Sequence, residues 1–451
     1  MKTLDQIATE LQGYDPQSLS AADVQAFLSR LIEPVQEVVE LPLFDAFGRV
    51  LADDVISPFD VPPHDNSAMD GYAFAGQQLT ANAALELEMV GTALAGKAWR
   101  GRVMPGQCVR IMTGAIMPPE LDTVVPQEFV TLQPAGESTE STRIRIPPGL
   151  LRAGDNRRLR GEDLMQGKPA LRKGELLTPA RLGLAASLGL KTLKTWRPLR
   201  VAYFSTGDEI LSLGEAPREG AVYDSNRYTV FGMLSRLGCQ VIDMGVVRDD
   251  PALLEAAFTR AAAQADAVIT SGGVSVGEAD FTKAMMKKLG DVAFWRIAMR
   301  PGRPMAVGRI LPPKSDRSPD STGQDGDQQH RNPHGAILFG LPGNPVAVMV
   351  TFLAFVRPAL LQMMGANTAV PPLLRAHSTE AIRKKPGRTE YQRGWVSTAP
   401  DGSLQVRTTG NQGSGVLSSM AEANGLIMLH HGQGSVAVGD EVDVMMFEGV
   451  L

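Results

Sequence analysis

Two short segments combine glycine, hydroxyl and acidic side chains in a pattern that could bind a phosphate group. Each follows an apolar run typical of a buried strand: Ser205-Thr-Gly-Asp-Glu209 and Ser271-Gly-Gly-Val-Ser-Val-Gly-Glu-Ala-Asp280. A Ser/Gly-rich turn between a strand and a helix exposes backbone N–H groups beside the positive end of the helix, where anions bind. The candidate binding residues in these turns are Ser205, Thr206, Gly207, Ser271, Gly272, Gly273 and Ser275.

The acidic side chains beside these turns indicate a divalent cation. Asp208, Glu209 and Asp280 would repel a bare anion at short range, whereas Mg²⁺ commonly bridges one or two carboxylates to phosphate oxygens. Each acid could instead cap a helix or a turn. In a further acidic turn, Arg248-Asp-Asp-Pro251, the residue before the proline is the expected helix cap, which leaves Asp249 either to a structural role or to the ligand crevice.

Arginines gather around one proline-glycine turn. Arg296, Arg300 and Arg303 lie in or near Arg300-Pro-Gly-Arg-Pro304. A guanidinium group presents a planar set of donors suited to phosphate or another oxyanion. A solvated surface turn would also accept these residues, so the sequence leaves both readings open.

The segment that carries these turns, 200–366, reads as a series of βα units. Apolar runs beginning at Val201, Gln240 and Ala267 alternate with helical patterns over 226–237, 251–265 and 279–289. Such alternation predicts a parallel sheet whose ligand crevice lies outside the carboxyl ends of the strands. Asn344 and Pro345 predict the start of a further helix, as cap and first-turn residue.

The flanking segments predict different structures. Helical spacing over 15–31 indicates a short N-terminal helix, and runs of β-branched residues with turn signals over 41–148 and after residue 372 indicate β domains. Residues 314–334 are polar and predict a flexible insert. We therefore expect a mixed linking domain (1–40 plus 149–197), a β-rich domain (41–148), an α/β domain (198–368) and a C-terminal β domain (369–451).

The composition excludes several classes of protein. The 451 residues allow two to four domains, and 43% hydrophobic and 21% charged residues are ordinary globular values. The 44 basic and 49 acidic residues give a net charge of −5, so nucleic acid is not an expected partner. Cys108 and Cys239 form no metal-binding motif. The longest apolar run, 346–356, is too short to span a bilayer, and we expect a soluble cytoplasmic protein without a membrane partner.

Several segments together resemble one family. They are Asn66-Ser-Ala-Met-Asp-Gly-Tyr-Ala73, Thr113-Gly-Ala115, Arg160-Gly-Glu-Asp163, the two glycine-containing turns and Leu341-Pro-Gly-Asn-Pro345. In order and spacing they resemble the molybdopterin molybdenumtransferases, the MoeA family, and are similar to the E domain of gephyrin. The resemblance implies a multidomain α/β protein with a central MoaB/Mog-like domain. It also implies a Mg²⁺-dependent reaction in which adenylylated molybdopterin and molybdate combine, molybdenum joins the dithiolene and AMP leaves.

The same resemblance implies roles for individual residues. The implied catalytic residues are Asp70, Thr113, Asp163, Glu209, Asp249 and Asp280, and the implied metal ligands are Glu209, Asp249 and Asp280. The implied substrate-binding residues, beyond those of the glycine turns, are Arg296, Arg300, Arg303, Pro342, Gly343, Asn344, Arg393 and Ser414. Arg296 and Arg300 stand where the family has lysines. In the family, Asp70 and Thr113 face the α/β domain of another subunit, which implies a homodimer with composite sites.

Two other functions remain open at this point. The α/β segment also resembles the adenylyltransferase that acts one step earlier, although that enzyme resembles this segment alone. A binding or scaffold protein without catalysis is the second alternative, which retention of Asp70, Glu209 and Asp280 disfavours. For an enzyme of this family, the upstream adenylyltransferase and downstream molybdoenzyme apoproteins are further candidate partners.

Overall fold

The computed structural model describes residues 2–133, 142–274, 280–311, 335–367 and 371–447, with only the backbone of residues 280 and 281. The predicted insert at 314–334 and Ser275 lie outside these ranges. The chain divides into two compact units. The first comprises Met1–Asp53, Gly174–Thr178 and Thr192–Leu451, and the second comprises Asp54–Lys173 and Pro179–Lys191.

The centre of the first unit is a six-stranded sheet in the order β16-β13-β17-β21-β20-β18. Its strands are β13 (Arg200–Thr206), β16 (Gln240–Val247), β17 (Ala267–Ser271), β18 (Gly290–Arg296), β20 (Pro304–Ile310) and β21 (Ala336–Leu341). The first four strands of the order run parallel, as predicted, whereas β20 and β18 are antiparallel to their neighbours. A short turn joins β18 to β20, and such a connection can only reverse the chain.

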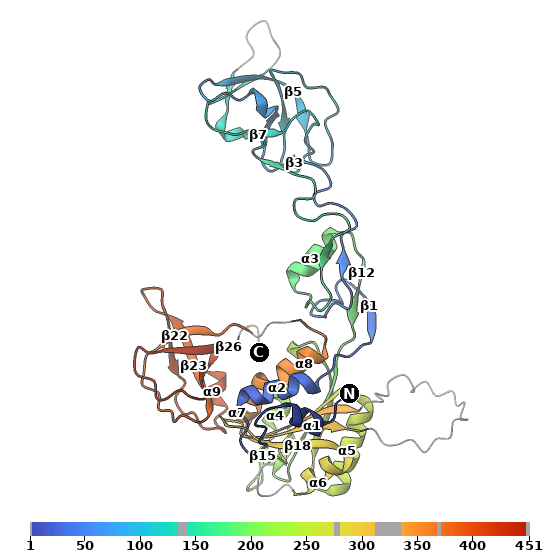
Figure 1. The fold of residues 1–451 in the computed structure, drawn as a ribbon, viewed down its shortest axis with the longest axis vertical. Helices are drawn as coiled ribbons and strands as arrows, with labels where there is room; N and C mark the ends of the chain where they lie inside the picture. The colour runs from blue at the N-terminus through green and yellow to red at the C-terminus, as the bar shows by residue number, and fades with distance from the viewer. Residues whose placement is uncertain (1, 134–141, 275–279, 312–334, 368–370, 448–451) are drawn as a thin grey trace, which may run out of the picture. The chain divides into compact units, whose positions relative to one another are not determined.

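Helices cover both faces of this sheet (Figure 1). They are α4 (Ser225–Arg236), α5 (Pro251–Gln264), α6 (Asp280–Leu289), α7 (Pro345–Thr351) and α8 (Arg357–Met363), the last two joined by a π-helical segment, Phe352–Val356. Val201 and Tyr203 of β13 pack in one core with α4, α7 and α8, while Ala202 and Phe204 pack in a second core with α5. Burial on both faces explains why the strands read as continuous apolar runs.

The apolar run near residue 350 belongs to this core. The helical stretch Pro345–Met363 has the length and composition of a membrane span, but 78% of its apolar window is buried within the protein. The apolar run 346–356 is too short to span a bilayer by itself, but α8 continues the helix beyond it. The argument from length therefore does not hold for the whole helical stretch. Burial, and not length, marks this stretch as a core helix.

The ends of the first unit extend this arrangement. The N-terminal helices α1 (Leu4–Glu10) and α2 (Ala21–Leu31) each begin with a capping box, and Ser20 starts α2 later than the predicted residue 15. Strands β1 (Val38–Pro42) and β12 (Thr192–Trp196) pair antiparallel. Short strands β14 (Ile210–Leu211) and β15 (Val222–Tyr223) lie between β13 and α4 in the chain.

The C-terminal strands close on themselves. The order β19-β23-β24-β22-β26-β25 includes an additional pairing of β23 with β25, so the last five strands form a ring. The strands are β19 (Met299–Arg300), β22 (Leu374–Ser378), β23 (Thr389–Thr398), β24 (Leu404–Thr408), β25 (Gly425–Leu429) and β26 (Glu441–Met446), with helix α9 (Ser418–Ala421). Because β19 precedes β20 in the chain, its pairing with β23 ties the ring to the central sheet.

The second unit is mainly β-structure. Its six-stranded sheet, in the order β7-β4-β6-β5-β9-β8, consists of β4 (Gly71–Phe74), β5 (Leu85–Ala93), β6 (Gln107–Ile111), β7 (Thr123–Pro126), β8 (Thr131–Gln133) and β9 (Arg143–Ile146). Two further pairs are β2 (Val55–Ile56) with β11 (Pro169–Leu171), and β3 (Asn66–Ser67) with β10 (Arg157–Arg158). The unit also contains α3 (Pro179–Ser187) and 3₁₀ turns at Gly76–Gln78 and Gln127–Phe129. The predicted fold class, a central α/β domain with β-rich segments, is confirmed, and the exact domain boundaries stay a prediction.

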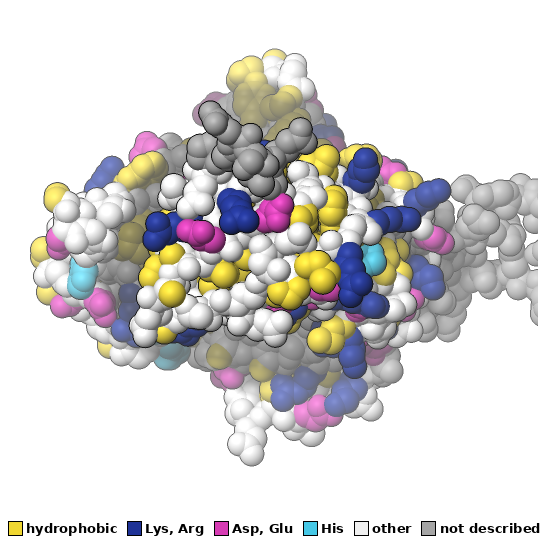
Figure 2. Space-filling model, turned by 90° about the horizontal axis from the view of Figure 1, so that it is seen from above, with side chains coloured by type: hydrophobic (Ala, Val, Ile, Leu, Met, Phe, Trp, Pro, Cys, Tyr) yellow, Lys and Arg dark blue, Asp and Glu magenta, His cyan; other side chains and the backbone are white. Residues whose placement is uncertain are grey.

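The surface carries both signs of charge. On the face drawn in Figure 2, dark blue basic and magenta acidic side chains alternate with apolar ones. This mixture accords with the near balance of 44 basic and 49 acidic residues.

A buried ion pair at the base of the central sheet should contribute strongly to stability. The Arg197 guanidinium donates two hydrogen bonds of 2.7 Å to Asp266, whose side chain is 3% exposed. Removing Asp266 takes away both of these bonds and the acceptor of the Arg200 N–H. The Arg197 guanidinium is then left with its exposed partner Glu37, so we expect Asp266→Ala to lower the free energy of unfolding by about 3 kcal/mol. Urea denaturation followed by circular dichroism would measure this change.

The matched control is Asp243→Ala. Asp243 pairs with Arg227 at 2.6 Å, but its side chain is 40% exposed, and a solvated pair is worth about 0–1 kcal/mol. Equal losses in the two variants would contradict the assignment of stability to the buried pair.

Candidate functional site

The strand-end turns of the central sheet are held together by buried hydroxyl groups. The Tyr203 hydroxyl lies 2.7 Å from Ser271 Oγ and 2.9 Å from Ser205 Oγ, and the two serine oxygens are 3.2 Å apart. All three side chains are buried, and burial raises the pKa of Tyr203, which stays protonated at neutral pH. The predicted binding residues Ser205 and Ser271 thus use their hydroxyls in hydrogen bonds inside the protein.

Glycine allows these turns to approach one another. Gly272 has a φ of +93°, and a Cβ there would lie 2.4 Å from the carbonyl oxygen of Thr206. Its N–H donates to Leu341 O at 3.1 Å, at the end of β21. The Asn226 amide, from α4, donates to Gly343 O at 2.7 Å. Three predicted segments, after β13, β17 and β21, therefore meet at one edge of the sheet.

The predicted metal ligands follow neighbouring strands. Glu209 comes after β13, Asp249 after β16 and Asp280 after β17, and these strands are adjacent in the sheet. The backbone N–H of Asp249 donates to Asp208 Oδ1 at 3.3 Å. Within the described residues, no three His, Cys, Asp or Glu side chains form a group that could hold a metal ion. The side chain of Asp280 lies outside those residues, so the predicted set of ligands stays a prediction.

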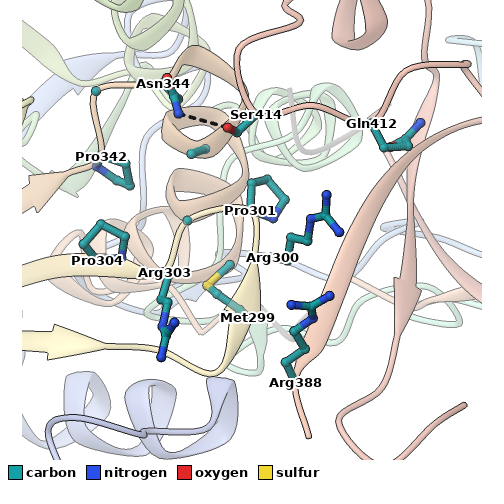
Figure 3. Close-up of a pocket in the computed structure, with 13 residues that line it drawn as sticks. Met299, Arg300, Pro301, Arg303, Pro304, Pro342, Asn344, Arg388, Gln412 and Ser414 are labelled. Atoms are coloured by element: carbon teal, nitrogen blue, oxygen red, sulfur yellow. Dashed lines mark hydrogen bonds between the residues drawn. The ribbon is translucent and has the colours of Figure 1, made fainter. Parts of the chain in front are cut away.

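Beside this edge lies a pocket of about 510 Å³ that is rich in arginine (Figure 3). It collects the predicted residues Arg300, Arg303, Pro342, Gly343, Asn344 and Ser414. Asn344 precedes α7, as predicted for a cap, but its side chain makes no capping bond and donates to Ser414 Oγ at 2.9 Å. The C-terminal ring and the start of α7 are thus joined across the pocket wall.

The lining residues that were not predicted include two from the C-terminal segment of the chain. Arg388 and Gln412 come from the C-terminal ring, and in Figure 3 the Arg388 guanidinium turns toward Arg300. The basic run over 383–388 was a signal for Arg388, but the spacing in the chain shows no link to Arg300, 88 positions earlier in the sequence. The pairing of β19 with β23 brings the two together.

A second cavity of about 200 Å³ shares Arg300 with the first. It is lined by the predicted residue Arg393, which is 1% exposed and donates to the carbonyl oxygens of Asn411 and Gly413 at 3.0 Å. Burial, together with the charge of Arg300, lowers the pKa of Arg393 to about 10, so it stays a cation at neutral pH. Arg296, at the end of β18, lines neither cavity.

Three predicted residues, Asp70, Thr113 and Asp163, belong to the second unit. Thr113 donates to Asp70 Oδ1 from both its hydroxyl and its backbone N–H, each at 2.7 Å. These bonds lower the pKa of Asp70, which is an exposed anion at neutral pH. Asp163 is exposed in a turn after Arg160, whose Nε donates to Asp60 Oδ2 at 2.6 Å.

The fold and pocket define a multidomain α/β protein with an arginine-lined pocket beside the glycine turns of its central sheet. Comparison with family models gives this class a name. Residues 19–189 match the MoeA N-terminal region (domain I and II), residues 202–362 a probable molybdopterin binding domain, and residues 375–447 the MoeA C-terminal region (domain IV).

Curated relatives match nearly the whole chain. A molybdopterin molybdenumtransferase of Haemophilus influenzae is 40% identical over 412 residues, which cover 91% of this chain and 94% of the relative. One from Nostoc sp. is 33% identical over 420 residues, 92% of this chain and 90% of the relative. The chain belongs to the MoeA family of molybdopterin molybdenumtransferases.

Solved structures share the fold. A molybdopterin biosynthesis MoeA protein from Pyrococcus horikoshii OT3 matches with a TM-score of 0.75 at 24% identity, over 95% of this chain and all of that one. A second structure from the same species has a TM-score of 0.67 at 27% identity, over 96% and 99% of the two chains. The architecture therefore extends over the whole length of these relatives.

We expect Thr113→Val to raise the pKa of Asp70 toward its ordinary value. The variant loses the hydroxyl donor, which favours the charged carboxylate, but keeps the backbone donor. A pH titration of the carboxyl ¹³C signal by NMR would measure the change. Thr92→Val, on an exposed part of β5 in the same unit, is the control and should leave the pKa of Asp70 unchanged. An unchanged Asp70 titration in Thr113→Val would contradict the role of the hydroxyl.

Proposed function

We propose that this chain is a transferase of molybdenum cofactor synthesis that inserts molybdenum from molybdate into adenylylated molybdopterin and releases AMP. The curated relatives carry the name of this activity and align over more than nine tenths of the chain. Matches to the N-terminal and C-terminal family regions, outside the α/β domain, disfavour an adenylyltransferase.

The arginine pocket is the observation that carries the proposal. Molybdate is a tetrahedral dianion, and the pocket offers it the guanidinium groups of Arg300 and Arg388 with the Ser414 hydroxyl. Charge-assisted hydrogen bonds from guanidinium to an oxyanion are short and directional. With about 510 Å³, the pocket has room for more than one oxyanion, so it also accommodates the sulfur-bearing end of the second substrate beside molybdate.

The glycine turns supply the other half of the site. We expect those backbone N–H groups of the turns after β13 and β17 that are not bonded within the protein to bind the phosphates of the adenylylated substrate at the sheet edge. Gly343 and Asn344 belong both to this edge and to the arginine pocket, through the Asn226 bond and the Ser414 bond. We expect this shared turn to align the dithiolene with molybdate while the phosphates stay at the strand ends.

Magnesium is part of the proposal. Glu209, Asp249 and Asp280, which follow adjacent strands, are the residues that we expect to hold it. Bound Mg²⁺ would neutralise charge on the phosphates and orient the leaving AMP. The protein itself contributes the carboxylates, the backbone donors and the arginines that bind and orient both substrates.

AMP release tests the proposed function directly. We expect anaerobic incubation with adenylylated molybdopterin, molybdate and Mg²⁺ to release AMP, and EDTA-treated enzyme to release none until Mg²⁺ returns. Chromatography of the nucleotide products measures both results. Release of AMP without molybdenum insertion, or full activity without a divalent cation, would contradict the corresponding part of the proposal, and no AMP at all would favour a scaffold protein.

The family resemblance extends the proposal to a homodimer. Asp70 and Thr113 belong to the second unit and the strand-end turns to the first, and we propose that each site uses Asp70 from one subunit and Asp280 from the other. We further propose a cytoplasmic enzyme that receives its substrate from the upstream adenylyltransferase and delivers the cofactor to molybdoenzyme apoproteins.

Mixed dimers distinguish a composite site from a site within one chain. When Asp70→Ala and Asp280→Ala chains are co-expressed, each heterodimer should carry both lesions in one site and leave the other intact. Random mixing makes about half of the dimers heterodimers, so roughly a quarter of wild-type activity should return. Heterodimers purified by two different tags should reach about half of wild-type activity. Activity no higher than that of either mutant, with heterodimers present, would refute the composite site.

A further inference from the structure

We propose that Glu390 is a positioning residue that holds Arg388 in the orientation needed to bind the oxyanion, an inference that rests on the proposed function of the pocket. Glu390 is 2% exposed, and Arg388 Nε donates to its Oε1 at 2.7 Å. Glu390 does not line the 510 Å³ pocket; it lines the smaller cavity behind it. It therefore acts on the pocket through Arg388.

The backbone holds Glu390 firmly at this place. Glu390 is opposite Arg300 in the parallel pairing of β23 with β19, and Thr389 N–H donates to Ala298 O at 2.9 Å. The second carboxylate oxygen, Oε2, accepts from Gln392 Nε2 at 3.2 Å. The same strand pairing that places Arg300 at the pocket thus fixes the carboxylate that anchors Arg388.

Anchoring through Nε determines which nitrogens face the pocket. A guanidinium group has five N–H donors in one plane, and a carboxylate bonded at Nε fixes that plane while the terminal nitrogens remain for another acceptor. Arginine has a flexible stem, so holding it in advance removes ordering entropy that the anion would otherwise have to offset. The Arg388 side chain lines the pocket wall in this arrangement (Figure 3).

The negative charge of Glu390 opposes the gain in anion binding that comes from holding Arg388 in place. Like charges repel, so a buried carboxylate behind the pocket weakens the binding of a dianion. Arg300, Arg383 and Arg393 line the same cavity and offset part of this repulsion. Positioning and repulsion can therefore be separated by variants that remove the charge with or without removing the hydrogen-bond acceptor.

The test measures molybdate binding by isothermal titration calorimetry on full-length variants. E390Q keeps an oxygen that accepts from Arg388 Nε and loses the charge, so we expect its Kd for molybdate to fall by about twofold. E390A loses the acceptor, and we expect its Kd to rise by about tenfold although the repulsion is gone. In turnover, E390A should raise the KM for molybdate and leave kcat nearly as it was.

Three comparisons identify the route of the effect. E390A in an Arg388→Ala background should bind no more weakly than Arg388→Ala alone, because the effect passes through Arg388. E441A removes an exposed carboxylate of the same ring that pairs with Arg375 at 3.2 Å, and should keep the wild-type Kd. Thermal melting shows that each variant is folded, and E390L, which also removes the acceptor but fills more of the space, replaces E390A if E390A is not folded.

The outcomes are distinguishable. Tighter binding by both E390A and E390Q would show that Glu390 acts by charge alone, and weaker binding by E390Q would show that it does not act by the acceptor oxygen; either result overturns the inference. If Arg388→Ala leaves Kd unchanged while Arg300→Ala weakens binding, the inference about Glu390 is contradicted, but the pocket is still supported as the oxyanion site. If neither substitution matters, the proposed oxyanion pocket itself fails.

Discussion

Two arginines from distant parts of the chain face one pocket, and like charges at short range repel. Arg300 is the last residue of β19, and Arg388 precedes β23. The protein brings them together through the pairing of β19 with β23, and it places a buried carboxylate, Glu390, against one of them. In the neighbouring cavity, the carbonyl oxygens of Asn411 and Gly413 accept hydrogen bonds from Arg393 and so stabilise its positive charge. The proposed ligand molybdate, a dianion, would complete this balance of charge.

The central sheet provides the rigid frame for this cluster. Alternate residues of β13 enter two separate cores, with Tyr203 on one side and Phe204 on the other. Helices on both faces leave the strand ends as the open edge, which is why ligand sites of such sheets lie there. The buried hydroxyls of Tyr203, Ser205 and Ser271 join two strands at that edge. These hydrogen bonds fix the ends of β13 and β17, from which the glycine turns begin.

Hydrogen bonds between segments far apart in sequence make the site continuous. The Asn344 amide reaches Ser414 in the C-terminal ring, and the Asn226 amide from α4 reaches Gly343. The turn between β21 and α7 is thereby attached on both sides. A displacement of this turn would alter the arginine pocket and the strand-end turns together.

Local sequence determined the elements. Apolar periodicity, the cap Asp250 with Pro251 after it, and the glycine turns predicted the βα order, and the motifs indicated the family. Tertiary structure alone decided the rest. The antiparallel strands β20 and β18, the inward direction of the Ser205 hydroxyl, the bond from Asn344 to Ser414 and the meeting of Arg300 with Arg388 all depend on contacts between distant residues. Spacing along a chain predicts which face of an element a side chain occupies, but the partner of that face is chosen only when the elements pack.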